Sequence, residues 1–291
     1  MADALAPYVV YVLNGLAYGM LLFSLSVGLS LIFGLMDVMN LAHGSFYMLG
    51  AYIALSIAAR AGGYWLALLV APLVLGLIGL LIAGGFLRLI SDRGHLDQVL
   101  LTLGFAYVFA DISRWIWGGD IFLVPAPPQL RASISILGNA FPLFRLFVIG
   151  IGLILALVTW LVLERTRLGA IVRAGVSDAE MLNGLGINVT LVFTLVFALG
   201  ALLAGFGGVI GGPILGVFPG VDLDILIIAL IVVVVGGLGT FRGAFWGSIL
   251  VGEVQTLGVA FAPQLALFLL FGLMALVLLV RPSGLLGQEV G

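Results

Sequence analysis

Apolar stretches of about 20 residues recur along nearly the whole chain, and they limit its possible folds more than any other feature. A helix of about 20 apolar residues crosses the hydrocarbon core of a bilayer, and no long strand-like alternation competes with these stretches. Hydrophobic residues make up 63% of the 291 positions and charged residues only 8%. The sequence therefore predicts an all-α, polytopic helical membrane protein in which residues 1–291 form a single transmembrane domain. We expect about eight or nine membrane segments, near residues 8–33, 40–59, 64–87, 98–118, 142–163, 189–217, 222–240, 243–261 and 264–281.

The arginines orient these segments, because loops on the cytoplasmic side of a membrane carry the excess of positive charge. If the polar interval Glu164–Asn188 is cytoplasmic and the segments alternate, seven arginines fall inside and four outside. This topology places the N-terminus outside and the C-terminal tail inside. The inside set is Arg88, Arg93, Arg165, Arg167, Arg173, Arg242 and Arg281, and the outside set is Arg60, Arg114, Arg131 and Arg145.

The interval Glu164–Asn188 is the longest polar stretch between two membrane segments. Within it, Ser177 followed by Glu180 matches a capping box, so a short helix should begin at Asp178. Three apolar side chains then form a ridge on this helix, and two glycines favour its end. A helix of this kind lies on lipid or docks to a soluble partner. Its residues are Ser177, Asp178, Ala179, Glu180, Met181, Leu182, Gly184, Leu185 and Gly186, with the ridge on Met181, Leu182 and Leu185.

Glycine occurs 42 times, although each glycine inside a helix costs about 1 kcal/mol relative to alanine. Many glycines lie four residues apart, a spacing that lets helix backbones approach closely within lipid. They are dense in 205–220 and 236–247, and we expect broken helices there. Transporters place substrate sites at such breaks, because unwound backbone must be buried or line a cavity. Gly212, Pro213 and Gly237 are therefore candidates for the translocation path.

A weak internal echo links Asn40–Phe46, NLAHGSF, with Gly239–Phe245, GTFRGAF. In each stretch a polar residue and a glycine precede a membrane segment, and the predicted topology puts both stretches at the cytoplasmic mouth. The echo is either an evolved repeat or a coincidence. We assign helix initiation and gating, rather than metal binding, to Asn40, His43, Gly44 and Arg242.

Glu253 lies deep inside a predicted segment, with Gln255 close by. A charge at the bilayer centre costs at least about 2.5–3.5 kcal/mol, so Glu253 should face the interior of the helix bundle. There it lines the path or forms a hydrogen bond with a neighbouring helix. Asp222 and Asp224, at an expected outer mouth, either attract an ammonium group or belong to a solvated turn.

Missing residue types exclude several functions. The chain has no lysine, so it lacks a P-loop and the basic footprint of a nucleic-acid-binding protein. It has no cysteine and only two histidines, His43 and His95, which leaves neither a disulfide framework nor a zinc cluster. Both histidines are expected at loop edges, so no buried base is available to activate a nucleophile. We therefore expect no enzyme activity, no catalytic residue, no metal site and no cofactor bound by this chain.

Three stretches together resemble one family. They are Phe33–Tyr52 with the block NLAHGSFYMLGAY, the interval Glu164–Asn188, and Val235–Gly247 together with Arg281–Gly287. In this order they are similar to the LivH-type permeases of branched-chain amino-acid ABC transporters, and the resemblance covers nearly the whole chain. It implies a multi-pass permease subunit of the bacterial inner membrane that does no bond chemistry itself.

The resemblance also implies partners and a role for the polar interval. The partners are a second, LivM-like permease subunit, two cytoplasmic ABC ATPases that hold ATP and Mg²⁺, a periplasmic substrate-binding protein and the lipid bilayer, with no nucleic acid. The segment Ser177–Ile187 is similar to the coupling helix of such permeases, which fits a cleft on the ATPase. We therefore interpret 164–188 as a cytoplasmic coupling loop.

The expected function is that of a permease subunit in an ATP-driven importer of small neutral, branched-chain amino acids. One alternative is a permease for urea or short amides within the same family. Another is an ion-coupled secondary transporter in which Glu253 is the ion site. A third is a passive channel or scaffold that needs no binding protein.

Overall fold

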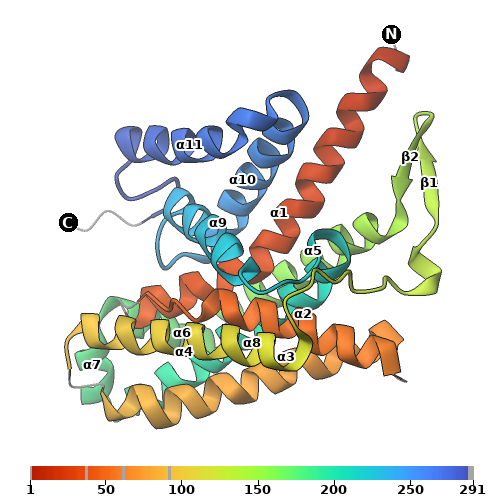
Figure 1. Ribbon diagram of the computed structural model, residues 1–291. Coiled ribbons are helices and arrows are strands. Elements are labelled where there is room, and N and C mark those ends of the chain that lie inside the picture. Colours follow the sequence, from red (N-terminus) through yellow and green to blue (C-terminus); the bar gives the residue numbers. More distant parts are fainter. Residues whose placement is uncertain (1, 37–38, 61–62, 91–92, 288–291) are drawn as a thin grey trace.

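The computed structural model describes residues 2–36, 39–60, 63–90 and 93–287. Most of this part of the chain is helical, and one β-hairpin lies between two helices (Figure 1). Asp37 and Val38, in the first resembling stretch, lie outside the described residues. The helices are α1 (Ala2–Met36), α2 (His43–Arg60), α3 (Gly63–Leu81), α4 (His95–Trp117), α5 (Leu143–Arg165), α6 (Arg167–Ser177), α7 (Ala179–Gly184), α8 (Val189–Leu215), α9 (Val221–Gly236), α10 (Phe241–Phe261) and α11 (Ala266–Val280). The shorter elements are the π-helix η1 (Ile82–Leu87), the 3₁₀ turns η2 (Pro128–Leu130) and η3 (Pro263–Leu265), and the antiparallel strands β1 (Ser133–Ile136) and β2 (Asn139–Pro142).

Seven of the described helices are long and apolar enough to cross a membrane, which confirms the prediction of an all-α, multi-pass membrane protein. Two of the nine predicted segments, 40–59 and 222–240, correspond to α2 and α9 and are not among the seven. α9 has 16 residues, a length of about 24 Å against a hydrocarbon core of about 30 Å. α2 has 18 residues, and polar residues open its first turn. Most residues of both helices are buried or half-buried inside the protein.

The molecule has two distinct ends (Figure 1). α1 starts on the same side as the β1–β2 hairpin, and α7 lies on the opposite side (Figure 1). We call these the hairpin end and the α7 end. The predicted topology assigns the hairpin end to the outside and the α7 end to the cytoplasm.

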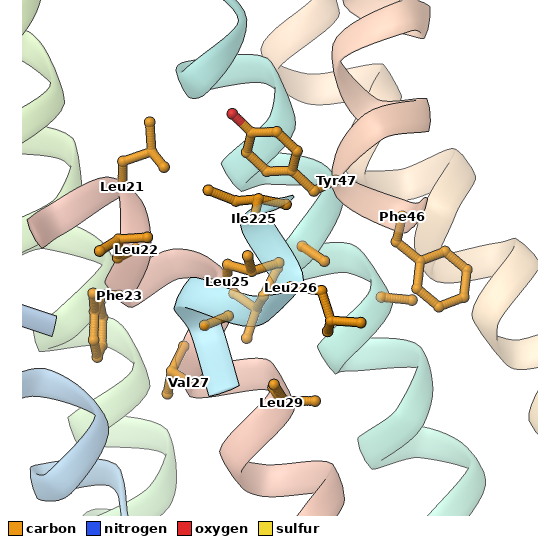
Figure 2. Packing of buried hydrophobic residues seen from close by; sticks show 14 of the residues in the cluster. Leu21, Leu22, Phe23, Leu25, Val27, Leu29, Phe46, Tyr47, Ile225 and Leu226 are labelled. Carbon is orange, nitrogen blue, oxygen red and sulfur yellow. The ribbon is translucent and has the colours of Figure 1, made fainter. Parts of the chain in front are cut away.

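α9 lies within the hydrophobic core. Figure 2 shows Ile225 and Leu226 of α9 between side chains of α1, such as Leu25, and the α2 side chains Phe46 and Tyr47. Leu25, Phe46 and Tyr47 have no exposed surface, and Ile225 and Leu226 are also buried. Contacts with α1 and α2 therefore fix the position of a helix that is too short to span a bilayer.

Glycines bring the long helices into backbone contact, as their spacing predicted. A Cβ atom added at Gly28 of α1 would lie 2.9 Å from the Cα atom of Gly200 in α8. One added at Gly252 of α10 would lie 2.6 Å from the Cα atom of Gly19 in α1. Real Cβ atoms essentially never come so close, so α1 approaches both α8 and α10 only because these positions lack side chains.

The glycine-rich breaks lie at helix ends. α8 stays helical through Gly205–Gly212 and past Pro213 to Leu215, so the break in the stretch 205–220 lies at the end of this helix. The chain turns where glycines take positive φ angles, at 75° and 115° between α8 and α9 and at 110° and 74° between α9 and α10. These residues are Gly216, Gly220, Gly237 and Gly239.

The crossing of α2 and α8 gives a test of this packing. A Cβ atom at Gly208 would overlap the carbonyl oxygen of Tyr47 and lie 2.9 Å from its carbonyl carbon, so a helix must shift to admit it. We expect Gly208→Ala to lower the free energy of unfolding by about 1–3 kcal/mol, seen as a lower thermal midpoint of the purified protein in detergent. Gly104→Ala in α4 is the matched control, because nothing lies within 4 Å of its added Cβ atom. A midpoint for Gly208→Ala at or above that of Gly104→Ala would contradict the packing.

Candidate functional site

The start of α2 carries a buried polar cluster. Asn40 is 1% exposed, and its Oδ1 accepts a hydrogen bond from the backbone NH of Ala42 at 3.1 Å. His43 is fully buried, and its Nε2 lies 2.9 Å from the carbonyl oxygen of Leu25. Because a carbonyl oxygen only accepts, Nε2 carries the proton and Nδ1 is left as an acceptor. Within the described residues, Nδ1 of His43 and Nδ2 of Asn40 have no hydrogen-bond partner, so the cluster keeps an unused donor and an unused acceptor.

The start of α9 meets the start of α2 inside the protein. Ser45 Oγ donates a hydrogen bond to Asp222 Oδ2 at 3.0 Å, and both residues are buried. Asp222 lies in the first turn of α9, where the helix dipole favours a carboxylate. Gly44 permits this approach, because a Cβ atom there would lie 2.9 Å from the carbonyl carbon of Asp222. The two shorter helices thus join through a serine–aspartate hydrogen bond and a backbone contact.

This junction corrects three predictions. The starts of α2 and α9 are in contact, so Asn40 and Asp222 do not lie at opposite mouths, and His43, predicted at a loop edge, is fully buried. Asp222 does not belong to a solvated turn at the opposite mouth, because it bonds to the α2 helix. The predicted topology separated these residues by a full membrane thickness on the assumption that both segments span it. Asp224 is exposed, as a solvated turn requires.

The two echoed stretches contact opposite ends of α9. Gly44, in the first stretch, lies against Asp222 in the first turn of that helix. Gly243, in the second stretch, lies against its last residue, with an added Cβ atom 2.7 Å from the carbonyl carbon of Gly236. Each echoed glycine therefore provides a site where α9 touches the backbone of another helix.

The second echoed stretch also borders a pocket. Thr240 caps α10, and its Oγ1 accepts a hydrogen bond from the backbone NH of Gly243 at 3.2 Å. Arg242 is exposed and lines a pocket of about 370 Å³ between α6 and the start of α10. Arg173 and Glu164 line the same pocket and form an ion pair with a nitrogen–oxygen distance of 3.8 Å.

Three further path candidates occupy packing positions. A Cβ atom at Gly212 would lie 2.5 Å from Cγ2 of Val124, in the connection that leads to the hairpin. One at Gly237 would lie 2.7 Å from the Cα atom of Gly287 in the C-terminal stretch. Pro213 lies inside α8, close to its end. Their contacts hold helices and connections together.

The interval Glu164–Asn188 contains two helices, α6 and α7, where one was predicted. α7 begins next to the predicted start, but its N-cap is Asp178 rather than Ser177, since Asp178 Oδ1 accepts a hydrogen bond from the backbone NH of Met181 at 2.8 Å. Ser177 is the last residue of α6, and its side chain and that of Ala179 lie outside the described part. The exposed Gly186 has a φ of 81° beyond the end of α7, as predicted, whereas Gly184 is helical.

The predicted apolar ridge of α7 is split between two faces. Met181 and Leu185 are 64% and 71% exposed, whereas Leu182 is 3% exposed. Leu182 faces α6, because a Cβ atom added at Gly175 would lie 3.7 Å from its Cδ1. Leu182 thus anchors α7 to the protein, and Met181 and Leu185 form the exposed apolar surface, with Glu180 also exposed.

Glu253 of α10 packs against α1, with its carboxyl group touching Gly15. Its Oε2 and the Oε1 of Gln255 are buried, and neither has a hydrogen-bond partner in the part of the chain that the structure describes. The predicted hydrogen bond to a neighbouring helix is therefore absent for these two atoms. Among the described residues, no group of three or more His, Cys, Asp or Glu side chains is placed to hold a metal ion.

Residues 11–278 match the model of the family described as branched-chain amino acid transport system, permease component. This chain belongs to that family. The permease is 29% identical to the high-affinity branched-chain amino acid permease protein BraD of Pseudomonas aeruginosa, over 97% of this chain and 96% of the relative. It is 27% identical to LivH of Salmonella typhimurium and 26% identical to LivH of Escherichia coli, in each case over 99% of this chain and 98% of the relative. No solved structure matches the permease.

Membership in the family confirms the resemblance found from the sequence motifs. The match extends over almost all of the helical part of the permease, from α1 to α11. The names of these relatives refer to branched-chain amino acids and not to urea or amides.

The Ser45–Asp222 junction can be tested by comparing substitutions at Asp222 and Asp224, the two acidic residues in the first turn of α9. Asp222→Ala leaves the buried Ser45 hydroxyl without its acceptor, which should cost about 1–3 kcal/mol and lower the thermal midpoint of the permease. Asp222→Asn keeps an acceptor and should recover most of that loss. Asp224→Ala is the control, because Asp224 is exposed. Equal midpoints for Asp222→Ala and Asp224→Ala would contradict a stabilising junction.

Proposed function

We propose that this permease is the membrane subunit of an ATP-driven importer that moves branched-chain amino acids across the bacterial inner membrane. The family match over residues 11–278 carries this proposal, and the names of its relatives support it. A second, LivM-like permease subunit and a periplasmic binding protein complete the transport path. The names of these relatives mention neither urea, nor short amides, nor a coupled ion.

Two cytoplasmic ATPase subunits supply the energy and hold ATP and Mg²⁺. The permease has no lysine and therefore no P-loop of its own. We assign ATPase docking to α7, in the 164–188 coupling loop, because Met181 and Leu185 present an apolar surface at the α7 end. Helix-in-groove docking through residues four apart is a common mode of recognition.

Contacts beneath α7 lead from this surface toward the interior junction. Leu182 lies beside Gly175 of α6, and a Cβ atom at Gly175 would lie 2.7 Å from Leu35 in α1. Farther along α1, a Cβ atom at Gly28 would lie 2.9 Å from Gly200 of α8 and 3.2 Å from the ring of His43. A displacement of α7 therefore acts on α1, which touches both α8 and the start of α2.

The docking assignment predicts a difference between two faces of α7. Met181→Glu combined with Leu185→Glu places charge on the exposed apolar surface and should weaken ATPase binding about tenfold or more. Asn183→Glu is the matched control, because Asn183 is also exposed and points to the opposite side of the helix. Co-purification of the ATPase subunits and ATP-dependent uptake measure the effect. Full assembly and uptake by the double variant would contradict docking on this face.

The substrate assignment predicts ATP-dependent leucine uptake by the complete complex in proteoliposomes with its binding protein. Excess isoleucine or valine should compete with labelled leucine, whereas urea and acetamide should not. Uptake of urea in place of leucine would contradict the proposal. Leucine uptake that an ion gradient drives without ATP would favour the secondary transporter instead.

A further inference from the structure

A second pocket, of about 380 Å³, opens between α1, α5, α8 and α10. It lies toward the hairpin end, because Leu215 is the last residue of α8 and Arg145 is in the first turn of α5, directly after β2. Among the described residues that line it, Arg145 is the charged one and none is acidic. The lining consists of Tyr11, Asn14, Ala17, Tyr18, Arg145, Ile214, Leu215, Gln255, Thr256, Val259 and Ala260.

The pocket favours an anion beside Arg145. Arg145 is half-buried, and its Nη1 donates a hydrogen bond to the neutral Oδ1 of Asn14. A guanidinium has five N–H donors in a planar fork that matches a carboxylate. The contact with Asn14 orients the fork and leaves donors for a carboxylate.

Other lining residues offer acceptors and apolar surface. The hydroxyl groups of Tyr11 and Thr256 are acceptors, and Ile214, Leu215 and Val259 are aliphatic. An ammonium group fits the acceptors and an aliphatic side chain fits the apolar wall.

We propose that this pocket binds the zwitterion of an aliphatic amino acid on the side of the permease opposite α7. Arg145 holds the carboxylate, the hydroxyl groups of Tyr11 and Thr256 accept from the ammonium group, and Ile214, Leu215 and Val259 surround the side chain. The inference rests on the proposed function and adds the binding site to it. A neutral ligand such as urea leaves the Arg145 charge uncompensated, so the pocket also explains selection against amides.

A thiol-protection experiment tests this site directly. The chain has no cysteine, so Ala260→Cys introduces a single thiol into the pocket of the permease within the complete transporter complex in nanodiscs. Labelling by a small sulfonated methanethiosulfonate is followed on this chain, without binding protein. Leucine should slow the labelling several-fold, and leucinol, which lacks the carboxylate, should not. Arg145→Gln in the same background should abolish the protection by leucine.

Two further cysteine variants show whether the protection is confined to this pocket. Ser133→Cys on the exposed hairpin should react at the same rate with and without leucine. Thr256→Cys, also in the pocket lining, replaces Ala260→Cys in the labelling experiment if that variant fails to assemble. Leucine uptake by the unlabelled variant, measured with binding protein, tests the transport function separately. Intact leucine uptake with no protection, or equal protection by leucinol, would overturn the site while the proposed function stands.

Discussion

Helix backbones touch at glycine throughout this permease, and the rest of the structure depends on that contact. Lipid tails are as apolar as leucine, so burying apolar side chains does not drive helices together within a membrane, and close van der Waals contact must do so. α1 shows the result: Gly28 meets Gly200 of α8, and Gly19 meets Gly252 of α10. The helix propensity lost at each glycine is about 1 kcal/mol, which the closer packing of whole helices offsets. α1 becomes the element around which α8 and α10 are placed.

Backbone contact at glycine also allows the two shorter helices α2 and α9 to start inside the protein. An open helix start exposes backbone NH groups, which are costly in an apolar interior unless they are paired. At α2 the Asn40 side chain accepts from one such group, and at α9 the Asp222 carboxylate lies in the first turn. Ser45 links the two starts through its bond to Asp222, a link that forms only because Gly44 has no side chain. The buried polar junction is therefore a consequence of glycine packing.

Hydropathy predicted the helices well, because a helix in lipid must form all of its backbone hydrogen bonds internally and be apolar over its length. Hydropathy did not predict which helices begin inside the protein. The prediction placed Asp222 at a membrane surface because residues 222–240 were counted as a complete crossing. The helix formed there, α9, has only 16 residues, and Asp222 is buried. The local rules for helix caps were nearly sufficient at α7, where Asp178 replaces the adjacent Ser177 as the N-cap. The burial of Leu182 depends on α6 beneath it, a tertiary contact that no local pattern contains.

The α2–α9 junction costs less free energy to open than a break in the middle of a long helix. Bending α1 or α8 in mid-helix breaks backbone hydrogen bonds that lipid cannot replace. Separating Ser45 from Asp222 breaks one hydrogen bond to a charged group, with a net value of about 1.5–3 kcal/mol. His43 contacts the carbonyl oxygen of Leu25 in α1, and among the described residues Asn40 and His43 keep an unused donor and an unused acceptor. The start of α2 is therefore joined to α1 beside the hydrogen bond that links it to α9.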